Sequence, residues 1–102
     1  MKYNIGIISI YKMNFEWDPE KSQENKKKHG VTFYDATEIW QRKRIDIPHI
    51  AYSKDGEICS ATIGFINGIL FTAIGTKRKK LIRLICVRRA RDGEKKAFFE
   101  TI

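Results

Sequence analysis

A chain of 102 residues can build one hydrophobic core and is too short for two. Hydrophobic residues make up 42% of it, with only 2 prolines and 7 glycines, which excludes a disordered or collagen-like protein. No apolar run approaches the roughly 18 residues of a membrane-spanning helix. The two cysteines, Cys59 and Cys86, lack the spacing of a disulfide framework or a CxxC zinc site. We therefore expect a protein of a reducing compartment, the cytoplasm, with neither a metal nor an organic cofactor.

The positive charge lies at one end of the sequence. Twenty Lys and Arg residues oppose 12 Asp and Glu residues, which gives a net charge of +8. Residues 1–76 hold ten basic and nine acidic residues, whereas residues 77–102 hold ten basic and three acidic ones. A cluster of this density attracts polyanions, of which nucleic acid is the most common. The alternative is a charged face that serves solubility alone.

The first twelve residues precede a second methionine, Met13, and carry no cap or turn signal that links them to the rest of the chain. We interpret residues 1–12 as an extension that is dispensable, either an upstream start or an extra strand. Residues 13–102 then form the single domain, with Met13 as its functional start. A short strand is expected over 14–17.

The first predicted helix has clear ends and no apolar face. Asp18 is a suitable N-cap, Pro19 suits the first helical turn and Gly30 ends the helix. Between them, residues 21–29 contain no apolar side chain. Helical spacing places Lys21, Asn25 and Lys28 on one face, where two cations and an amide could meet a ligand. The alternative is an ordinary solvated surface helix.

A second helix is predicted from Thr32, with Asp35 in the capping-box position. Its apolar residues, which recur at helical spacing and so predict packing on the core, are Phe33, Ala36, Ile39 and Trp40. Residues 42–44 are basic, as suits the end of a helix.

The rest of the chain predicts a meander of strands and a last helix. Pro48 marks residues 45–50 as an edge strand, and Asn67-Gly68 is a strong hairpin signal. The expected elements are a turn at 53–57, strands at 58–66, 69–75 and 81–87, a basic loop at 76–80, and a helix at 91–100. The fold class is therefore α+β, with two N-terminal helices, a curved antiparallel sheet of three to four strands, and a C-terminal helix. We expect the helices on one face of the sheet.

Three arginines, Arg78, Arg83 and Arg88, follow each other at intervals of five. Arg83 interrupts an apolar strand, so its guanidinium needs a partner. Asp55 and Glu57 are the acidic residues nearby in the chain, at a turn, and a substrate phosphate is therefore the expected partner. Strand alternation places Arg83 and Arg88 on opposite faces, so convergence of the two requires a bend near Val87.

The chain resembles the BrnT toxins of bacterial BrnT/BrnA toxin–antitoxin modules. The resemblance covers Phe15 to Glu100, about four fifths of the chain. It is carried by the opening Phe15-Glu16-Trp17-Asp18-Pro19 with Lys21, Asn25, Lys28, His29 and Gly30, by Val31-Thr32-Phe33 and Ile63-Gly64, and by residues 82–90 (IRLICVRRA) with Glu94. The chain departs from the family pattern at Cys59, where an arginine is common, at Lys79-Lys80, and at Phe98.

This resemblance implies a RelE-like fold and a ribonuclease that cleaves RNA without a metal and inhibits translation. It also implies a BrnA-like ribbon-helix-helix antitoxin as partner, through which the toxin would meet operator DNA only indirectly. A noncatalytic basic module that binds nucleic acid or only its antitoxin is the alternative.

We assign candidate site residues on this basis. Arg83 and Arg88 are expected to stabilise phosphate and Arg78 to bind substrate, because the planar guanidinium matches phosphate oxygens. The general base is the gap, since no interior strand glutamate is expected, and Lys28 and His29 are the candidates for it. The expected RNA-binding residues are Lys21, Lys77, Lys79, Lys80 and Arg89.

Overall fold

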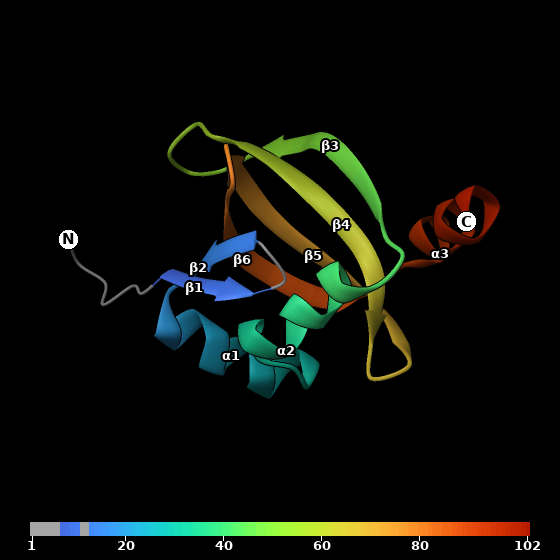
Figure 1. Cartoon of the computed structure of the whole chain (residues 1–102), viewed down its shortest axis with the longest axis horizontal. Helices are drawn as coiled ribbons and strands as arrows, with labels where there is room; N and C mark the ends of the chain where they lie inside the picture. The colour runs from blue at the N-terminus through green and yellow to red at the C-terminus, as the bar shows by residue number, and fades with distance from the viewer. Residues whose placement is uncertain (1–6, 11–12) are drawn as a thin grey trace.

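An antiparallel ladder of three long strands forms the centre of the protein, as the computed structural model shows for residues 7–10 and 13–102 (Figure 1). The strands are β4 (Ile58–Ile66), β5 (Ile69–Arg78) and β6 (Leu81–Arg89). Asn67 and Gly68 join the first two with φ values of 48° and 80°, the positive values that a tight hairpin turn needs. The hairpin predicted at this position is confirmed.

The prediction of a basic loop at 76–80 is wrong, because β5 continues to Arg78 and β6 begins at Leu81. Arg78 pairs directly with Leu81, and only Lys79 and Lys80 lie between the strands. Charged side chains need not end a strand when they can point to solvent, so the density of lysines was misleading. Arg78 is consequently a strand residue with a fixed direction.

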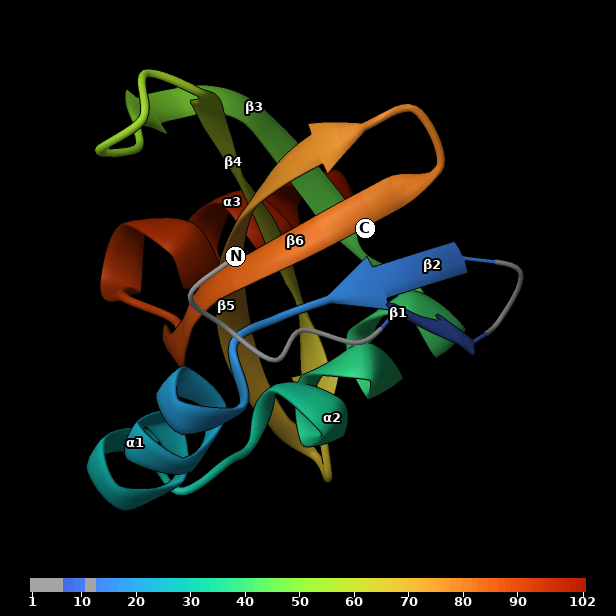
Figure 2. The same ribbon diagram turned by 90° about the vertical axis from the view of Figure 1, so that its left-hand side faces the viewer.

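The sheet has more strands than predicted and is mixed. β3 (Ile45–Tyr52) borders β4, while β2 (Met13–Glu16) lies beside β6 and runs parallel to it. With β1 (Ile7–Ile10) at the far edge, the order is β1-β2-β6-β5-β4-β3. Figure 2 shows β2 alongside β6, the contact that unites the two ends of the domain. In this parallel pair Phe15 lies opposite Ile82, and no local sequence pattern predicts a pairing between positions so far apart.

The edge position of β3 is confirmed, since it pairs with β4 alone. Its register shifts between Ile47 and Ala51, the interval that contains Pro48. At the opposite edge, β1 pairs with β2, so four of the first twelve residues form a strand. The other residues of that extension lie outside the described part of the chain, and its dispensability stays a prediction.

The polar helix α1 (Pro19–His29) begins and ends as predicted. The Asp18 carboxylate accepts a hydrogen bond from the backbone N–H of Glu20 at 2.9 Å, and Gly30 takes a left-handed φ of 83°. In place of an apolar stripe, the helix docks through hydrogen bonds. The Asn25 amide donates to the carbonyls of Val31 and Val87 at 2.9 and 2.8 Å and accepts from Val87 N–H at 3.0 Å.

Asn25 is therefore buried, with 5% of its surface exposed, and the face expected to present it together with two lysines does not exist as such. Ser22 is buried as well, and its hydroxyl accepts a hydrogen bond from Phe33 N–H. These two polar side chains occupy the positions that apolar residues hold in an ordinary amphipathic helix.

The second helix is shorter than predicted. The Thr32–Asp35 capping box is present, and α2 (Phe33–Ala36) makes one turn before it continues as a 3-10 helix, η1 (Thr37–Gln41). Thr37 donates its hydroxyl to the Tyr34 carbonyl at 2.7 Å at the junction, a local bond that competes with regular helix. The four apolar residues predicted for the core are all buried: Phe33, Ala36, Ile39 and Trp40.

The helices lie on both faces of the sheet, and the expectation of one face is wrong. On β5, Phe71 and Ala73 join the core cluster beneath α2. The intervening Leu70 and Thr72 face the other way, toward α3 (Asp92–Thr101). Phe98 anchors α3 there with 2% of its surface exposed, and α3 stands well apart from α1 and α2 (Figure 1).

No helix in the described ranges is long and apolar enough to cross a membrane.

Replacing Asn25 with Ala should lower the free energy of unfolding by about 2–4 kcal/mol, because it strands buried backbone groups of Val31 and Val87. Urea denaturation measures this change. The control is Gln23→Ala on the exposed face of the same helix, which should change stability by less than about 0.5 kcal/mol. Equal stability of the two variants would show that hydrogen bonds do not hold α1.

Candidate functional site

Four side chains form a row across the sheet at one level. Thr76 of β5 lies opposite Cys59 of β4 on one side and Arg83 of β6 on the other, and Arg83 lies beside Glu16 of β2. Residues in register on neighbouring strands point to the same face. This face is the one that α3 covers further along, since Thr72 and Thr76 stand four positions apart on β5.

A β-bulge in β6 orients the arginines. Cys86 lies opposite Ile74 and Leu84 opposite Gly75, which leaves Ile85 without a partner residue. The extra residue reverses the alternation, so that Arg83 and Arg88 share a face, as their predicted convergence required. They stand opposite Thr76 and Thr72, about 13 Å apart along the sheet. They share a surface but cannot both contact one phosphate.

Gly75 permits this bulge. A Cβ atom at position 75 would collide with the backbone carbonyl of Arg83, because the two strands approach closely where the register shifts. The glycine is required here by close approach of the backbone.

A pocket of about 450 Å³ opens over three members of the row, Cys59, Thr76 and Arg83, while Glu16 lies beside it. Its floor comes from β4, β5 and β6, and its walls from the start of α1 and the turn between β3 and β4. The lining residues are Asp18, Lys21, Tyr52, Ser53, Lys54, Asp55, Glu57, Cys59, Thr76, Arg83, Leu84 and Ile85. The pocket therefore collects residues from positions 18 to 85 of the chain.

Arg83 has a carboxylate neighbour that sequence reasoning missed. Its Nε lies 3.3 Å from Oε2 of Glu16, whose side chain is 11% exposed. Parallel pairing of β2 with β6 brings this acid in from 67 positions away, so the carboxylate beside Arg83 is neither Asp55 nor Glu57, the two acids nearby in the chain. We also expected no interior strand glutamate, and this expectation was wrong because Glu16 is a buried residue of β2. A possible signal was the position of Glu16 within a predicted strand, between Phe15 and Trp17.

The contact with Glu16 does not satisfy Arg83. Within the described residues, two buried side-chain polar atoms lack a hydrogen-bond partner: Nε of Arg83 and Oγ1 of Thr76. Both belong to pocket-lining residues in adjacent positions of the row. Thr76 was not among the residues that the sequence suggested.

Carboxylates hold the other two predicted arginines. Arg78 donates to both carboxylate oxygens of Glu57, at 2.8 and 2.6 Å, on the rim of the pocket. Arg88 donates to both oxygens of Glu94 on α3, at 2.7 and 2.9 Å, and is 16% exposed. The hydrogen bonds from Arg88 lower the pKa of Glu94 to about 2. Arg88 thereby fastens α3 to the sheet.

Lys21 is the predicted cation that α1 contributes to the pocket, from its first turns. Lys28 and His29 lie on the last turn, exposed, and Lys28 is about 10 Å further along the helix axis than Lys21. They do not line the pocket.

The remaining predicted RNA-binding residues are spread over the surface. Lys77 lies on the other side of the sheet from Arg83, with its ammonium 3.4 Å from Asp46. Lys79 and Lys80 are exposed at the turn after β5, and Arg89 is exposed at the end of β6. Lys77 directly follows Thr76 of the pocket floor in sequence, but none of the four residues lines the pocket.

Cys59 lies in the row, at the position where the resemblance led us to expect an arginine. Burial raises the pKa of its thiol, and the charge of Glu57 raises it further. A protonated thiol is a weak nucleophile, so Cys59 contributes shape to the floor of the pocket and no reactive group.

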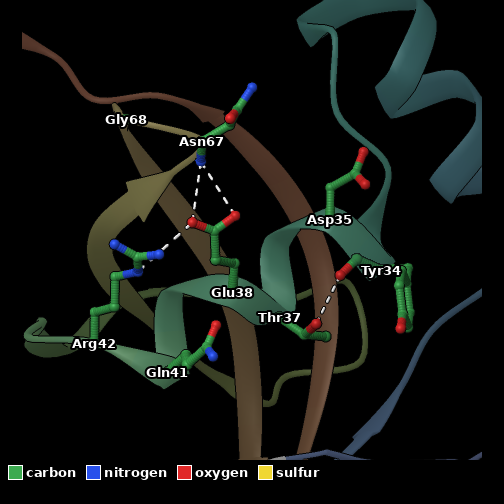
Figure 3. A pocket seen from close by; sticks show the side chains of 8 residues that line it. All are labelled: Tyr34, Asp35, Thr37, Glu38, Gln41, Arg42, Asn67 and Gly68. Carbon is green, nitrogen blue, oxygen red and sulfur yellow. Dashed lines mark hydrogen bonds and ion pairs between the residues drawn. The ribbon is translucent and has the colours of Figure 1, made fainter.

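A second pocket, of about 620 Å³, lies between α2, η1 and the hairpin turn (Figure 3). Its polar groups bond to each other: the Glu38 carboxylate accepts from Asn67 N–H at 3.1 Å and lies 3.8 Å from Nε of Arg42. Figure 3 shows these groups turned toward one another across the opening. The sheet pocket, with its unpaired donors, is therefore the better candidate site.

Fold and site together define a small basic α+β protein with an arginine at the floor of a sheet pocket. A family model described as the ribonuclease toxin BrnT of type II toxin–antitoxin systems matches residues 17–94. The chain belongs to this family, as its sequence motifs predicted, and is a ribonuclease toxin whose partner is an antitoxin. The match spans all of the elements from α1 to β6 and ends at Glu94. A comparison with curated proteins gave no match.

The Arg88–Glu94 pair should make stability fall in acid. The pKa of Glu94 is about 2 in the folded protein, below its ordinary value of 4.5, so the pair stabilises fully above pH 4.5 and is lost as pH falls toward 2. Glu94→Gln should cost about 2 kcal/mol at pH 7, and the difference from wild type should shrink toward pH 2. Thermal melts from pH 2 to 7 measure this. A difference independent of pH would contradict the assignment.

Proposed function

We propose that the protein cleaves RNA without a metal, in the sheet pocket, with Arg83 as the central catalytic residue. The observation that carries this proposal is the guanidinium of Arg83, which lies in the pocket floor with its Nε donor unused. A phosphodiester offers the acceptor that this donor lacks. The charge of the chain, +8 overall, attracts the same substrate.

The reaction needs three roles, and the site offers a residue for each. The 2′-oxygen of the RNA attacks the adjacent phosphorus while its proton passes to the carboxylate of Glu16. The bond from phosphorus to the 5′-oxygen breaks, and that oxygen takes a proton from the ammonium of Lys21. Water then carries the proton from Glu16 to Lys21, which returns both groups to their starting state. Arg83 stabilises the charge that gathers on the phosphoryl oxygens. The products are a 2′,3′-cyclic phosphate and a 5′-hydroxyl.

Glu16 is assigned as the base on its position. It lies 3.3 Å from the residue that binds the phosphate, and its carboxylate forms no hydrogen bond within the described residues. The neighbouring acids are engaged: Asp18 caps α1 and Glu57 binds Arg78. Lys28 and His29, the candidates from sequence, lie at the far end of α1, and we assign them no part in the chemistry.

The other arginines and lysines support the site. Arg88 holds α3 in place through Glu94, and Arg78 shapes the rim through Glu57. RNA would follow the exposed cations of the β5–β6 turn, Lys79 and Lys80, toward Lys21. Lys77 and Arg89 would add to the field at longer range.

We further propose the cellular role that the family resemblance suggests. RNA cleavage by the free toxin would inhibit translation in the cytoplasm, and a BrnA-like ribbon-helix-helix antitoxin would neutralise it and link it to operator DNA. A RelE-like relationship of the fold belongs to the same proposal.

The second candidate is a noncatalytic module that binds RNA or the antitoxin. The pairing of Arg78 and Arg88 with carboxylates, together with Cys59 in the row, favours it, because these features remove guanidinium groups from the pocket. Turnover separates the two functions: a binding module protects RNA and does not convert it to products with 5′-hydroxyl ends.

Arg83→Ala should lower kcat/KM for RNA cleavage in EDTA at least 100-fold, because the phosphoryl charge loses its main partner. It should also cost about 1–3 kcal/mol of stability, since Glu16 stays buried without a countercharge. Cleavage is measured below the melting temperature, with circular dichroism on the same sample. The control is Arg42→Ala, which removes an arginine that also contacts a carboxylate but is 63% exposed and lies outside the sheet pocket. This variant should cleave RNA like wild type. Undiminished cleavage by folded Arg83→Ala would remove Arg83 from the site.

Glu16→Gln should lower the single-turnover rate of RNA cleavage at least 100-fold, because an amide cannot accept the proton of the 2′-hydroxyl. Single-turnover rates of wild type and variant under the same conditions measure this, with circular dichroism on the same samples. Undiminished cleavage by folded Glu16→Gln would remove Glu16 from the role of base.

A further inference from the structure

Among the described residues, every buried threonine hydroxyl but one has a hydrogen-bond partner. Thr62 donates to Asp46 at 2.7 Å, and Thr72 donates to Glu94 at 3.0 Å. Thr76 is as deeply buried, at 2% exposure, yet its hydroxyl has no partner among the described residues. A buried hydroxyl without a hydrogen bond is unfavourable, so its retention calls for an explanation.

The residue that carries the unpaired hydroxyl lines the sheet pocket. Thr76 lines the sheet pocket and stands opposite Arg83 in the β5–β6 register. Side chains at such paired positions are direct neighbours, with Cβ atoms about 4.5–5.5 Å apart. The other unpaired buried atom, Nε of Arg83, belongs to that same pair. The two buried side-chain atoms that lack a hydrogen-bond partner in the described residues therefore belong to directly neighbouring positions of the sheet.

The functional groups of Thr76 and Arg83 indicate which kind of ligand they could bind. A hydroxyl and a guanidinium N–H can both donate, and the guanidinium adds positive charge. Lys21 supplies a further cation from the wall of the pocket. Two converging donors and two cations fit an oxyanion, and the phosphoryl group of RNA presents oxygens in that arrangement.

We propose that Thr76 is a catalytic residue whose Oγ1 donates a hydrogen bond to a non-bridging phosphoryl oxygen held beside Nε of Arg83. This inference rests on the proposed ribonuclease function. The bond strengthens as the phosphoryl oxygens gain charge in the transition state, so Thr76 acts on kcat more than on KM. Glu16 lies 3.3 Å from the same Nε atom, on the neighbouring strand β2, and the bulge at Ile85 sets the face to which Arg83 points.

The test replaces the hydroxyl by a methyl group of the same shape. Thr76→Val should lower kcat about 10- to 100-fold with KM within threefold and with an unchanged or higher melting temperature, because no hydrogen bond within the protein is lost. Thr76→Ser, which keeps the hydroxyl, should recover most of kcat.

The matched control is Thr62→Val, a threonine of equal burial on the same hairpin whose hydroxyl is already bonded to Asp46. It should show the opposite result, a lower melting temperature with kcat within twofold of wild type. Active Thr76→Val would overturn the proposal. So would a loss of kcat that accompanies a fall in melting temperature, or failure of both Thr76→Val and Thr76→Ala to fold, since each would give the hydroxyl a structural role.

Phosphate binding supplies a readout that does not depend on cleavage. Titration with inorganic phosphate should raise the melting temperature of wild type and of Thr76→Ser, and have a smaller effect on Thr76→Val. Equal shifts in all three would overturn the proposal. Absence of RNA cleavage by the wild type would contradict the ribonuclease function itself, and the phosphate titration would then still decide whether Thr76 binds an oxyanion.

Discussion

The parallel pairing of β2 with β6 is the contact on which the site depends. It places Glu16 beside Arg83 and directs the chain from β2 into α1 next to the bulge of β6. The same step puts Asp18 and Lys21 into the wall of the pocket. Without this pairing the central hairpins could still form, but Arg83 would lack its countercharge and the pocket one of its walls. The strand that joins the ends of the sheet is thus also the strand that assembles the site.

Hydrogen bonds take the place of apolar packing in helix α1. Asn25 forms three hydrogen bonds with main-chain groups of β6 and of the segment after α1, and Ser22 adds one. Satisfied bonds of this kind fix geometry more narrowly than apolar contacts, because each donor requires one acceptor in one direction. The position of Lys21 at the pocket therefore results from the anchoring of α1 one turn later. A helix without an apolar face is well suited to this role, since its exposed side can carry charge.

The two arginines of β6 differ in whether their side chains have hydrogen-bond partners, and this difference indicates which of them is structural. Arg88 has a bidentate carboxylate partner and a fixed role under α3, whereas Arg83 has an ion-pair contact and an unused donor in an open pocket. Both residues belong to one strand, and the bulge at Ile85 gives them one face. Their surroundings on neighbouring strands decide which of them is free to bind a substrate. Two arginines of the same strand can therefore have different roles, one structural and one in binding.

The sequence by itself determined what depends on neighbours in the chain. The ends of α1, the capping box at Thr32, the Asn67-Gly68 turn and the burial of Phe33 and Trp40 result from local sterics and from periodicity, and the family could be recognised from motifs. Only the tertiary structure decided what depends on strand register. The bulge at Ile85, the parallel partner of β6, the placement of α3 on the second face and the contact of Glu16 with Arg83 join positions up to 67 residues apart. A shift of one residue in register reverses the face of every side chain on a strand, and register is set by the whole sheet at once. For this reason Arg83 could be named from the sequence, whereas Glu16 and Thr76 became visible beside it only in the folded chain.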